Sequence, residues 1–366
     1  MEEKKKKKPL DIIRNYWWIL SILMAICAIL SMFFPVLTYE IREAVYDNLT
    51  EDRLSKVDYV YSMNLISYFT TGFKLNYMMY ITLGIIFAGI GFVVGGIFKK
   101  ELRIVGGVSF LLAICFIVLF GEFFSADINE VMTYAKVAGT TYDPATQTFV
   151  ASFHGASISW GSAIVIIFLS LAFATTVFTD VKSTTRQIAE EGVLISAAFV
   201  LNYIKIPIGA SGGSINFQML PLMIIALRHG PIHGFISGGV IYGLLSCLTD
   251  GYGFACYPFD YLIGFGSVGI MGLFRNFIFS EGQKTYNFKG LLFIFIGGIL
   301  STFVRYFGSN VSSIVIYGLD LKGALVYNSF YIPLSGLIAI IPLMALYKPL
   351  IDINLRFPVK RETISA

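Results

Sequence analysis

Ten apolar segments dominate this chain of 366 residues, and they limit its fold more than any other feature. A helix needs about 20 predominantly apolar residues to cross the roughly 30 Å of hydrocarbon in a bilayer. Because lipid offers no partners to backbone amides and carbonyls, such segments are stable as helices, whose backbone groups bond internally. The sequence therefore predicts an all-α integral membrane protein with about ten transmembrane helices, near residues 17–37, 78–98, 104–124, 159–178, 191–206, 215–227, 232–249, 256–274, 290–307 and 325–347.

Charged residues are scarce and unevenly placed. They make up 14% of the chain, whereas soluble domains carry about 25%. The net charge of +4 comes from Lys and Arg in short loops, a pattern that does not indicate nucleic-acid binding. Basic residues at 4–8, 99–103 and 348–361 mark one side of the membrane, and the positive-inside rule places that side in the cytoplasm. We therefore expect a multi-pass protein of the plasma membrane with both termini in the cytoplasm.

A polar linker at residues 180–190 separates two parts of the chain. All three tryptophans precede this linker, and we find no internal repeat that relates the two parts. The sequence thus predicts a four-helix N-terminal unit of unassigned role at residues 1–182, a six-helix unit at 183–350 and a cytoplasmic tail at 351–366.

The sequence lacks the motifs of common enzymes. A Walker A loop requires G-x-x-x-x-G-K-[S/T] to hold phosphates, and in the nearest run, from Glu281 to Thr285, Gln283 separates the glycine from the lysine. We find no metal-ligand spacing, HExxH motif or Ser–His–Asp set, and the three histidines are dispersed. We therefore expect that the chain is not an enzyme and has no cofactor, metal or ATPase site of its own.

One carboxylate, Asp260, lies early in the apolar segment 256–274. Ionisable side chains inside membrane spans cost several kcal/mol and commonly serve a function. Asp260 can accept hydrogen bonds from a cationic or amino-bearing ligand in an outward-facing cavity. It can equally be an interfacial aspartate stabilised by the dipole of a helix N-terminus. Arg305, near the outer end of the segment 290–307, can neutralise Asp260 or extend to the membrane interface.

Polar and aromatic residues gather at the outer ends of the last two segments. Tyrosine and asparagine there can stack on a flat heterocycle and hydrogen-bond it. Tyrosines also populate the ordinary aromatic belt of membrane proteins, so both interpretations stay open. The residues concerned are Ser309, Asn310, Tyr317, Tyr327 and Asn328.

Two stretches rich in small residues frame the start of the second unit. Gly212 and Gly213 precede Asn216 at the entry to the segment 215–227, and glycine lets backbone approach a ligand closely because it has no Cβ. Earlier in the chain, small residues recur on one helix face, at Gly192, Ser196 and Ala197. Such a face allows close helix packing in lipid, either inside the unit or against a partner.

The run from Gly212 to Pro231, the pair Asp260–Tyr261 with the glycines after it, and residues 326–331 match one pattern. They resemble the substrate-binding S component of energy-coupling factor (ECF) transporters, thiamine type, over roughly residues 186–347. The resemblance implies a six-helix bundle with one outward vitamin pocket. It also implies that a transmembrane coupling protein and two ATP-binding-cassette ATPases power uptake.

The resemblance further implies site residues. The family's acidic residue and tyrosine on the fourth helix correspond to Asp260 and Tyr261, with Asp in place of Glu, and its asparagine on the sixth helix corresponds to Asn328. Ser309 and Tyr317 take positions that carry histidine and an aromatic residue, often tryptophan, in the family. These differences leave thiamine or a related heterocycle as the expected ligand.

The pocket lid and the docking surface follow from the same resemblance. The lid loop corresponds to residues 209–214, which contain no aromatic residue, and Gly323 takes the place of a pocket tyrosine for which Tyr327 can substitute. The face with Gly192, Ser196 and Ala197 corresponds to the surface that docks the coupling protein.

Two other hypotheses compete with a vitamin-binding subunit. One is an ATP-independent secondary transporter or channel that uses Asp260 and Arg305 as its ion or proton residues. The other is a membrane scaffold or sensor in which the four-helix unit matters most and the pocket has degenerated. Binding and uptake experiments distinguish the three.

Overall fold

The structure is a computed structural model that describes residues 17–47, 53–66, 78–132, 147–178, 183–208, 213–279, 283 and 285–358. The chain divides into two compact units, Met1–Thr179 and Asp180–Ala366. Gly212, one of the expected site residues, lies outside the described residues.

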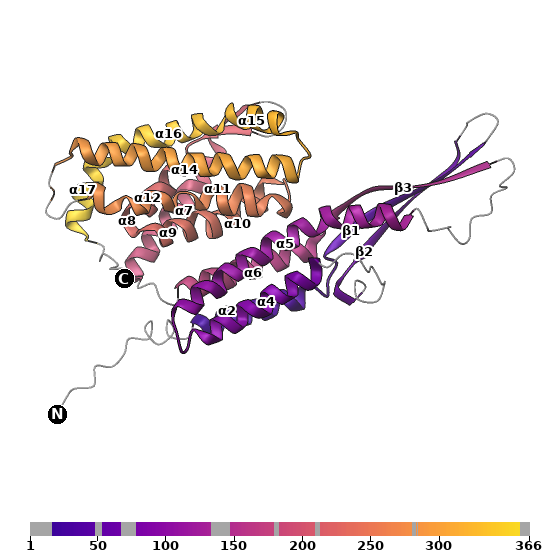
Figure 1. The fold of residues 1–366 in the computed structure, drawn as a ribbon. Coiled ribbons are helices and arrows are strands. Elements are labelled where there is room, and N and C mark those ends of the chain that lie inside the picture. Colours follow the sequence, from indigo (N-terminus) through magenta and orange to yellow (C-terminus); the bar gives the residue numbers. More distant parts are fainter. Residues whose placement is uncertain are drawn as a thin grey trace. The chain divides into compact units, whose positions relative to one another are not determined.

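The first unit contains a bundle of long apolar helices (Figure 1). Helix α5 packs against both α4 and α6, and α2 packs against α6. The hydroxyl of Ser21 on α2 donates to the carbonyl of Ala172 on α6 over 2.8 Å, which joins two helices distant in sequence. These helices correspond to the four spans expected in the first half, and they are α2 (Trp17–Ser31), α4 (Met78–Gly95), α5 (Glu101–Met132) and α6 (Trp160–Phe178).

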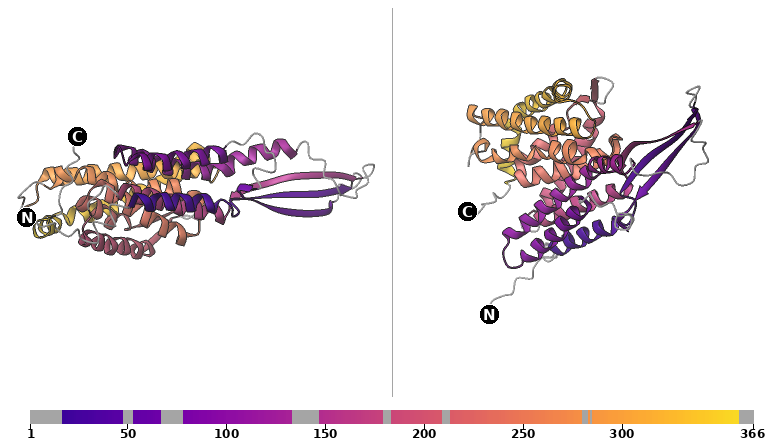
Figure 2. Two further views of the ribbon diagram at one scale, coloured as in Figure 1. Left: turned by 90° about the horizontal axis from the view of Figure 1, so that it is seen from below. Right: turned by 45° about the vertical axis from the view of Figure 1, so that its right-hand side comes forward.

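A three-stranded antiparallel sheet extends from the helices of the first unit (Figure 2). Its central strand β1 (Leu37–Asp47) pairs with β2 (Arg53–Met63) on one edge and β3 (Gln147–Ile158) on the other. The sequence interpretation treated these regions only as polar loops. A period-two pattern is present, since Val57 and Tyr59 alternate with Lys56 and Asp58, and such alternation is typical of strands.

The second unit begins with α7 (Thr185–Tyr203), a hairpin of β4 (Lys205–Ile208) and β5 (Gly213–Asn216), and α8 (Met219–His229). Thr184 caps α7, because its hydroxyl accepts from the amide of Gln187 while that side chain accepts from the amide of Thr184. Such a capping box satisfies two amide donors that a helix N-terminus leaves free.

Four further helical segments complete the second unit, and two of them contain π-helical turns. Wide turns of this kind occur frequently at functional sites. The segments are α9–η1–α10 (Pro231–Phe235, Ile236–Tyr242, Gly243–Asp250), η2–η3–α11–α12 (Phe254–Cys256, Tyr257–Ile263, Gly264–Gly266, Gly269–Leu273), α14 (Phe288–Val315) and α15–α16 (Leu321–Ser329, Ile332–Ala345). Two short helices, α13 (Arg275–Ile278) and α17 (Tyr347–Arg356), flank them.

The two π-helical turns, η1 and η3, pack against each other closely. A Cβ on Gly239 of η1 would lie 2.5 Å from the carbonyl oxygen of Leu262 on η3, so only glycine fits there. This contact fixes η3 against its neighbour, and η3 carries the acidic residue singled out in the sequence.

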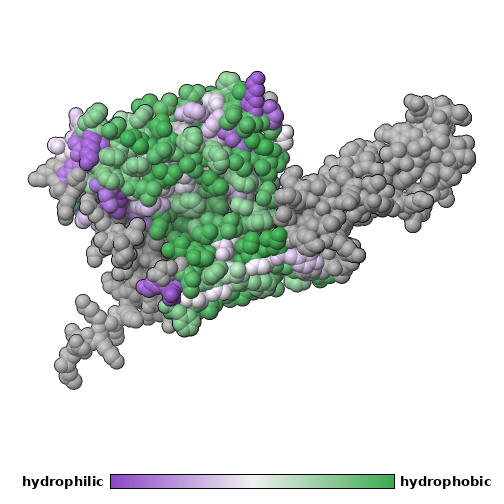
Figure 3. Space-filling model, in the orientation of Figure 1, coloured by the Kyte–Doolittle hydropathy of each residue, from purple (hydrophilic) through white to green (hydrophobic). Residues whose placement is uncertain are grey.

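The structure confirms the fold class. Among the described residues, six helical segments are long and apolar enough to cross a membrane, and three shorter apolar helices accompany them. Helix α7 accounts for the tenth expected span. Figure 3 shows apolar side chains over the helices of the second unit, where Phe303, Phe307 and Ile341 are more than 60% exposed. The chain is a multi-pass membrane protein.

Candidate binding pocket

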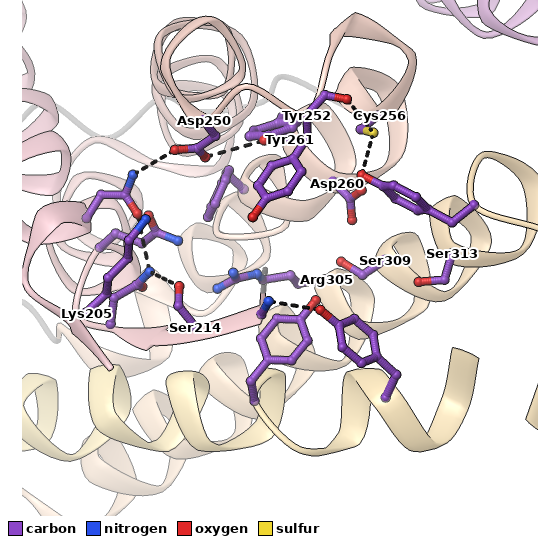
Figure 4. A pocket seen from close by; sticks show the side chains of 18 of the residues that line it. Lys205, Ser214, Asp250, Tyr252, Cys256, Asp260, Tyr261, Arg305, Ser309 and Ser313 are labelled. Carbon is purple, nitrogen blue, oxygen red and sulfur yellow. Dashed lines mark hydrogen bonds between the residues drawn. The ribbon is translucent and has the colours of Figure 1, made fainter. Parts of the chain in front are cut away.

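A cavity of about 420 Å³ opens at one end of the second unit (Figure 4). Pockets for small molecules typically measure about 300–1,000 Å³ and combine apolar walls with a few polar groups. The walls here come from the end of α7, the β4–β5 hairpin, the ends of α8 and α10, η2 and η3, α14, and the α15–α16 segment. Of the expected site residues, it brings together Asp260, Tyr261, Ser309, Tyr317, Tyr327, Gly213 and Asn216.

Asp260 enters the cavity from the π-helical turn η3. The hydroxyl of Ser312 on α14 donates to its Oδ2 over 2.5 Å. Arg305, on the same helix as Ser312, forms no ion pair with Asp260. The carboxylate is therefore oriented by a neutral neighbour, and its charge is available to a ligand.

A second carboxylate, Asp250, also lines the cavity, and the sequence interpretation missed it. Asp250 is the last residue of α10, which Gly251 ends in the left-handed conformation at φ 78°. Its oxygens accept from the side chains of Asn202 (3.3 Å), Ser246 (2.9 Å) and Tyr261 (3.4 Å). These hydrogen bonds hold the Asp250 carboxylate in place and connect α7, α10 and η3 at the cavity wall. Because Asp250 directly precedes Gly251, the sequence indicated that it lies in a loop.

Arg305 is almost fully buried at 7% exposure and lines the same cavity. Its guanidinium carbon lies 4.8 Å from the ring centroid of Phe265. Arg305 does not reach the surface, and it lies within electrostatic range of Asp260 without forming a direct ion pair with it. The sequence showed a cationic residue inside an apolar segment. It could not show toward which part of the unit the Arg305 side chain extends.

Three tyrosines, Tyr317, Tyr327 and Tyr331, line the cavity. The hydroxyl of Tyr327 accepts from the amide of Gly213 over 2.9 Å, so it ties α15 to the hairpin. A Cβ on Gly213 would lie 2.8 Å from the ring of Tyr331, which explains the need for glycine at this point. The hydroxyl of Tyr317 lies 3.1 Å from the sulfur of Cys256.

Asn328 does not line the cavity. It is fully buried behind the wall, where its amide donates to the oxygens of Asn310 (3.2 Å) and Ser313 (3.0 Å). Its Oδ1 accepts from the hydroxyl of Tyr331, a lining residue, over 2.9 Å. Asn328 therefore orients a pocket tyrosine rather than facing the cavity itself.

The small-residue face of α7 lies apart from this cavity. Gly192 and Ser196 are exposed, and Ala197 is half-buried. The hydroxyl of Ser196 donates to the carbonyl of Gly192 within the same helix over 2.8 Å. The hydroxyl on this face is therefore already hydrogen-bonded within the helix.

A second polar cluster joins the start of α7 to α8 and α9. Arg228 pairs with Glu190 through its Nε and, at 2.9 Å, through its Nη2. His233 Nδ1 lies 2.6 Å from Glu191, and His229 lies 3.7 Å from Glu190. In the part of the chain that the structure describes, no group of three His, Cys, Asp or Glu side chains is arranged to hold a metal ion. The cluster is a buried ionic contact between helices.

One family model matches the chain within its second unit. Residues 188–354 match the model of a family described as thiamine transporter protein (Thia_YuaJ). The thiamine transporter ThiT of Bacillus subtilis is 26% identical over 180 residues, which are 44% of this chain and 90% of that protein. ThiT of Lacticaseibacillus paracasei is 28% identical over 141 residues, 36% of this chain and 68% of its own length. An uncharacterized protein of Pyrococcus woesei is 30% identical over 135 residues, 37% of this chain and 82% of its length.

Two solved structures each align with part of the chain. ThiT from Listeria monocytogenes aligns with 23% identity and a TM-score of 0.40, over 44% of this chain and 93% of that one. The S component of a bacterial ECF transporter aligns with 21% identity and a TM-score of 0.34, over 46% of this chain and 98% of that one.

Proposed function

Because the chain belongs to the thiamine transporter family through its second unit, we propose that residues 183–350 form the S component of an ECF importer. In this proposal the pocket faces outward and binds thiamine or a related heterocycle. The observation that carries it is the convergence of Asp260, Tyr261 and the tyrosines of α15–α16 on one cavity, within the region of the family match.

The pocket residues suit a flat, amino-bearing cation. Asp260 supplies a carboxylate that can accept hydrogen bonds from an aminopyrimidine, and Ser312 keeps that carboxylate oriented. Tyrosine rings can stack on a heterocycle and stabilise a positive charge over their faces by about 0.5–2 kcal/mol. Tyr317 and Tyr327, together with Tyr331, provide such rings around the cavity.

Partner proteins supply the energy in this proposal. The chain binds its ligand without converting it, and two ATP-binding-cassette ATPases act through a transmembrane coupling protein. The exposed face with Gly192 and Ser196, beside the half-buried Ala197, is the docking surface, because small residues let another helix approach closely. Residues 1–182, which include the first unit, are an additional membrane region without an assigned role.

Binding of thiamine to the purified chain tests the ligand assignment. Trp17, Trp18 and Trp160 are all in the first unit, so calorimetry is a better probe of the pocket than tryptophan fluorescence. Asp260→Asn is expected to weaken binding at least tenfold, which is about 1.4 kcal/mol. Asp352→Asn, a change at a half-exposed carboxylate on α17, serves as the control and leaves affinity unchanged. Equal affinity in wild type and Asp260→Asn would remove the pocket assignment.

Uptake into liposomes tests the energy source. The chain reconstituted with the coupling protein and ATPases is expected to import thiamine only when ATP is supplied. Uptake by the chain alone, without ATP, would instead support the secondary transporter. Because Gly192→Leu fills the small-residue face of α7, we expect it to reduce ATP-driven uptake while calorimetric binding stays intact.

A further inference from the structure

Helix α17 lies across the end of the second unit that is opposite to the pocket. At its start the hydroxyl of Tyr347 donates to the carbonyl of Ile278 in α13 over 2.6 Å. At its other end the ring of Phe357 lies against Arg186 at the start of α7, with 3.5 Å between the guanidinium carbon and the ring centroid. The cavity is lined by Asn202, near the other end of α7. Figure 1 shows α17 turned away from the direction of α16, so it crosses the end of the bundle and does not continue the span.

The side chains of α17 differ from one face of the helix to the next. Residues four apart share a face of a helix, and positions 348, 352 and 356 carry Lys, Asp and Arg. Ile353 and Leu355 flank this charged face, one on each side, and are 40% and 46% exposed. The buried side chains, which pack on the unit, are Tyr347, Leu350 and Ile351. Exposed apolar residues beside a charged face are typical of a helix that lies in the membrane interface.

Exposed basic residues surround α17. Arg186 lies against its end, Lys289 is in the first turn of α14, which packs on the start of α17, and Arg356 is on the helix itself. Asp352 is the one acidic residue of α17, and it pairs with Lys348 at 2.5 Å. The surface around α17 therefore carries a net positive charge. Basic residues at a membrane surface are attracted to its anionic lipids.

We propose that α17 is an interfacial helix that binds acidic phospholipids of the surrounding bilayer. Ile353 and Leu355 enter the boundary between headgroups and acyl chains, and the cations Arg186, Lys289 and Arg356 bind lipid phosphates, with which they form charge-assisted hydrogen bonds.

The position of α17 favours lipid as the occupant. It directly follows Leu321–Ala345, a segment long and apolar enough to cross a membrane, so it starts where that segment leaves the hydrocarbon. Its exposed apolar residues occur on both sides of the charged face, whereas a soluble partner would cover one side. The inference is independent of the proposed function, because it involves neither the pocket nor the docking face.

Fluorescence quenching in vesicles tests the inference on the full-length chain. The four native cysteines are replaced by alanine, and a fluorophore is attached to Ile353→Cys. The protein is reconstituted in phosphatidylcholine that contains a small fraction of nitroxide-labelled phosphatidylglycerol or, in parallel, of nitroxide-labelled phosphatidylcholine. Because the basic residues enrich acidic lipid near the label, the phosphatidylglycerol quencher is expected to be about twofold more effective.

Matched variants identify the charges and the place. Arg186→Gln combined with Arg356→Gln is expected to make the two quenchers equal at position 353. Lys322→Gln, at an exposed cation of α15 near the other end of the unit, is expected to leave the preference unchanged. A fluorophore on Leu321→Cys, also on α15 and 63% exposed, is expected to show no preference.

Three results would overturn the inference. They are quenching by neither lipid at position 353, equal quenching by both lipids, and a preference for phosphatidylglycerol that persists in the double arginine variant. In the first case the face of α17 would be assigned to water or to a protein partner. If the cysteine-free chain does not fold, amide hydrogen exchange of wild type decides. Exchange in α17 is expected to be slower in nanodiscs that contain phosphatidylglycerol than in phosphatidylcholine alone, and equal exchange rates would overturn the inference.

Discussion

Arg228 and Arg305 are both buried in the second unit, at 2% and 7% exposure, but their surroundings differ. Arg228 pairs with Glu190 on the neighbouring helix α7. Arg305 contacts the ring of Phe265 and pairs with none of the described carboxylates. In one case the fold supplies a paired carboxylate, and in the other the guanidinium lies against an aromatic ring.

The two arginines therefore differ in whether a carboxylate of the protein forms an ion pair with the guanidinium. A buried ion pair contributes little net stability compared with apolar packing, but breaking it is strongly destabilising because one charge is left uncompensated. Arg228 therefore fixes α7, which carries the proposed docking face, onto α8. Arg305 instead maintains a charged cavity wall, and the fold tolerates its cost. The comparison predicts opposite responses when each arginine is neutralised.

The largest expected effect is the loss of stability in Arg228→Met. This change leaves Glu190 without its partner, and breaking a buried pair costs roughly 3 kcal/mol. Thermal unfolding of the purified chain in detergent measures it, and we expect a clear fall in the unfolding midpoint. Arg305→Met removes an uncompensated buried charge, so its midpoint is expected to stay level or to rise.

Arg356→Met, a change at an exposed arginine on α17, is the control for the loss of a positive charge. Equal destabilisation by Arg228→Met and Arg305→Met would show that the two arginines have the same structural role. The distinction drawn between the two ends of the unit would then be wrong.

A smaller effect is expected from Asn328→Ala, and it concerns affinity. Asn328 lies behind the pocket wall and accepts from the hydroxyl of Tyr331. Without this acceptor the ring is less well oriented, so thiamine binding is expected to weaken about tenfold, or 1.4 kcal/mol. Tyr331→Phe removes the same hydrogen bond and keeps Asn328, so it isolates this contribution in calorimetry. Unchanged affinity in both variants would show that Asn328 serves packing alone.

The helices and the central carboxylate could be predicted from the sequence because their signals are local. Runs of apolar residues indicate spans wherever lipid surrounds the chain, and Asp260 is conspicuous inside such a run. The same reasoning located Ser309, Tyr317 and Tyr327 at one end of the last two helices, and the structure brings them to the same cavity.

Other features depend on contacts between distant segments and carry no local signal. From the sequence, Asp250 was placed in a loop, and only the structure shows that α10 ends at the cavity. Asn328 was expected to contact the bound molecule, but the structure shows that it bonds Tyr331, which lines the pocket. The direction of Arg305 depends on how α14 packs against η3. The sheet of the first unit was not predicted, because the many acidic residues of this region were interpreted as a polar loop. The alternation of Val57 and Tyr59 with polar residues was overlooked.

The smallest expected effects come from two serines that each donate to a buried carboxylate. Ser312 donates to Asp260 in the pocket, and Ser237 donates to Glu191 in the ionic cluster over 3.2 Å. Loss of one such hydrogen bond costs about 1 kcal/mol. In Ser312→Ala the carboxylate that meets the ligand loses its orienting donor, so thiamine affinity is expected to fall about fivefold, since 1.4 kcal/mol corresponds to tenfold.

Ser237→Ala is the matched variant at the other end of the unit. Glu191 keeps its contact with His233 at 2.6 Å, so we expect a slightly lower unfolding midpoint and the same thiamine affinity as wild type. Calorimetry and thermal unfolding on both serine variants separate the two effects. If Ser237→Ala weakens thiamine binding as much as Ser312→Ala does, the ionic cluster and the pocket are energetically coupled. The cluster would then have to be treated as coupled to the binding site, with a coupling free energy equal to the change in binding free energy.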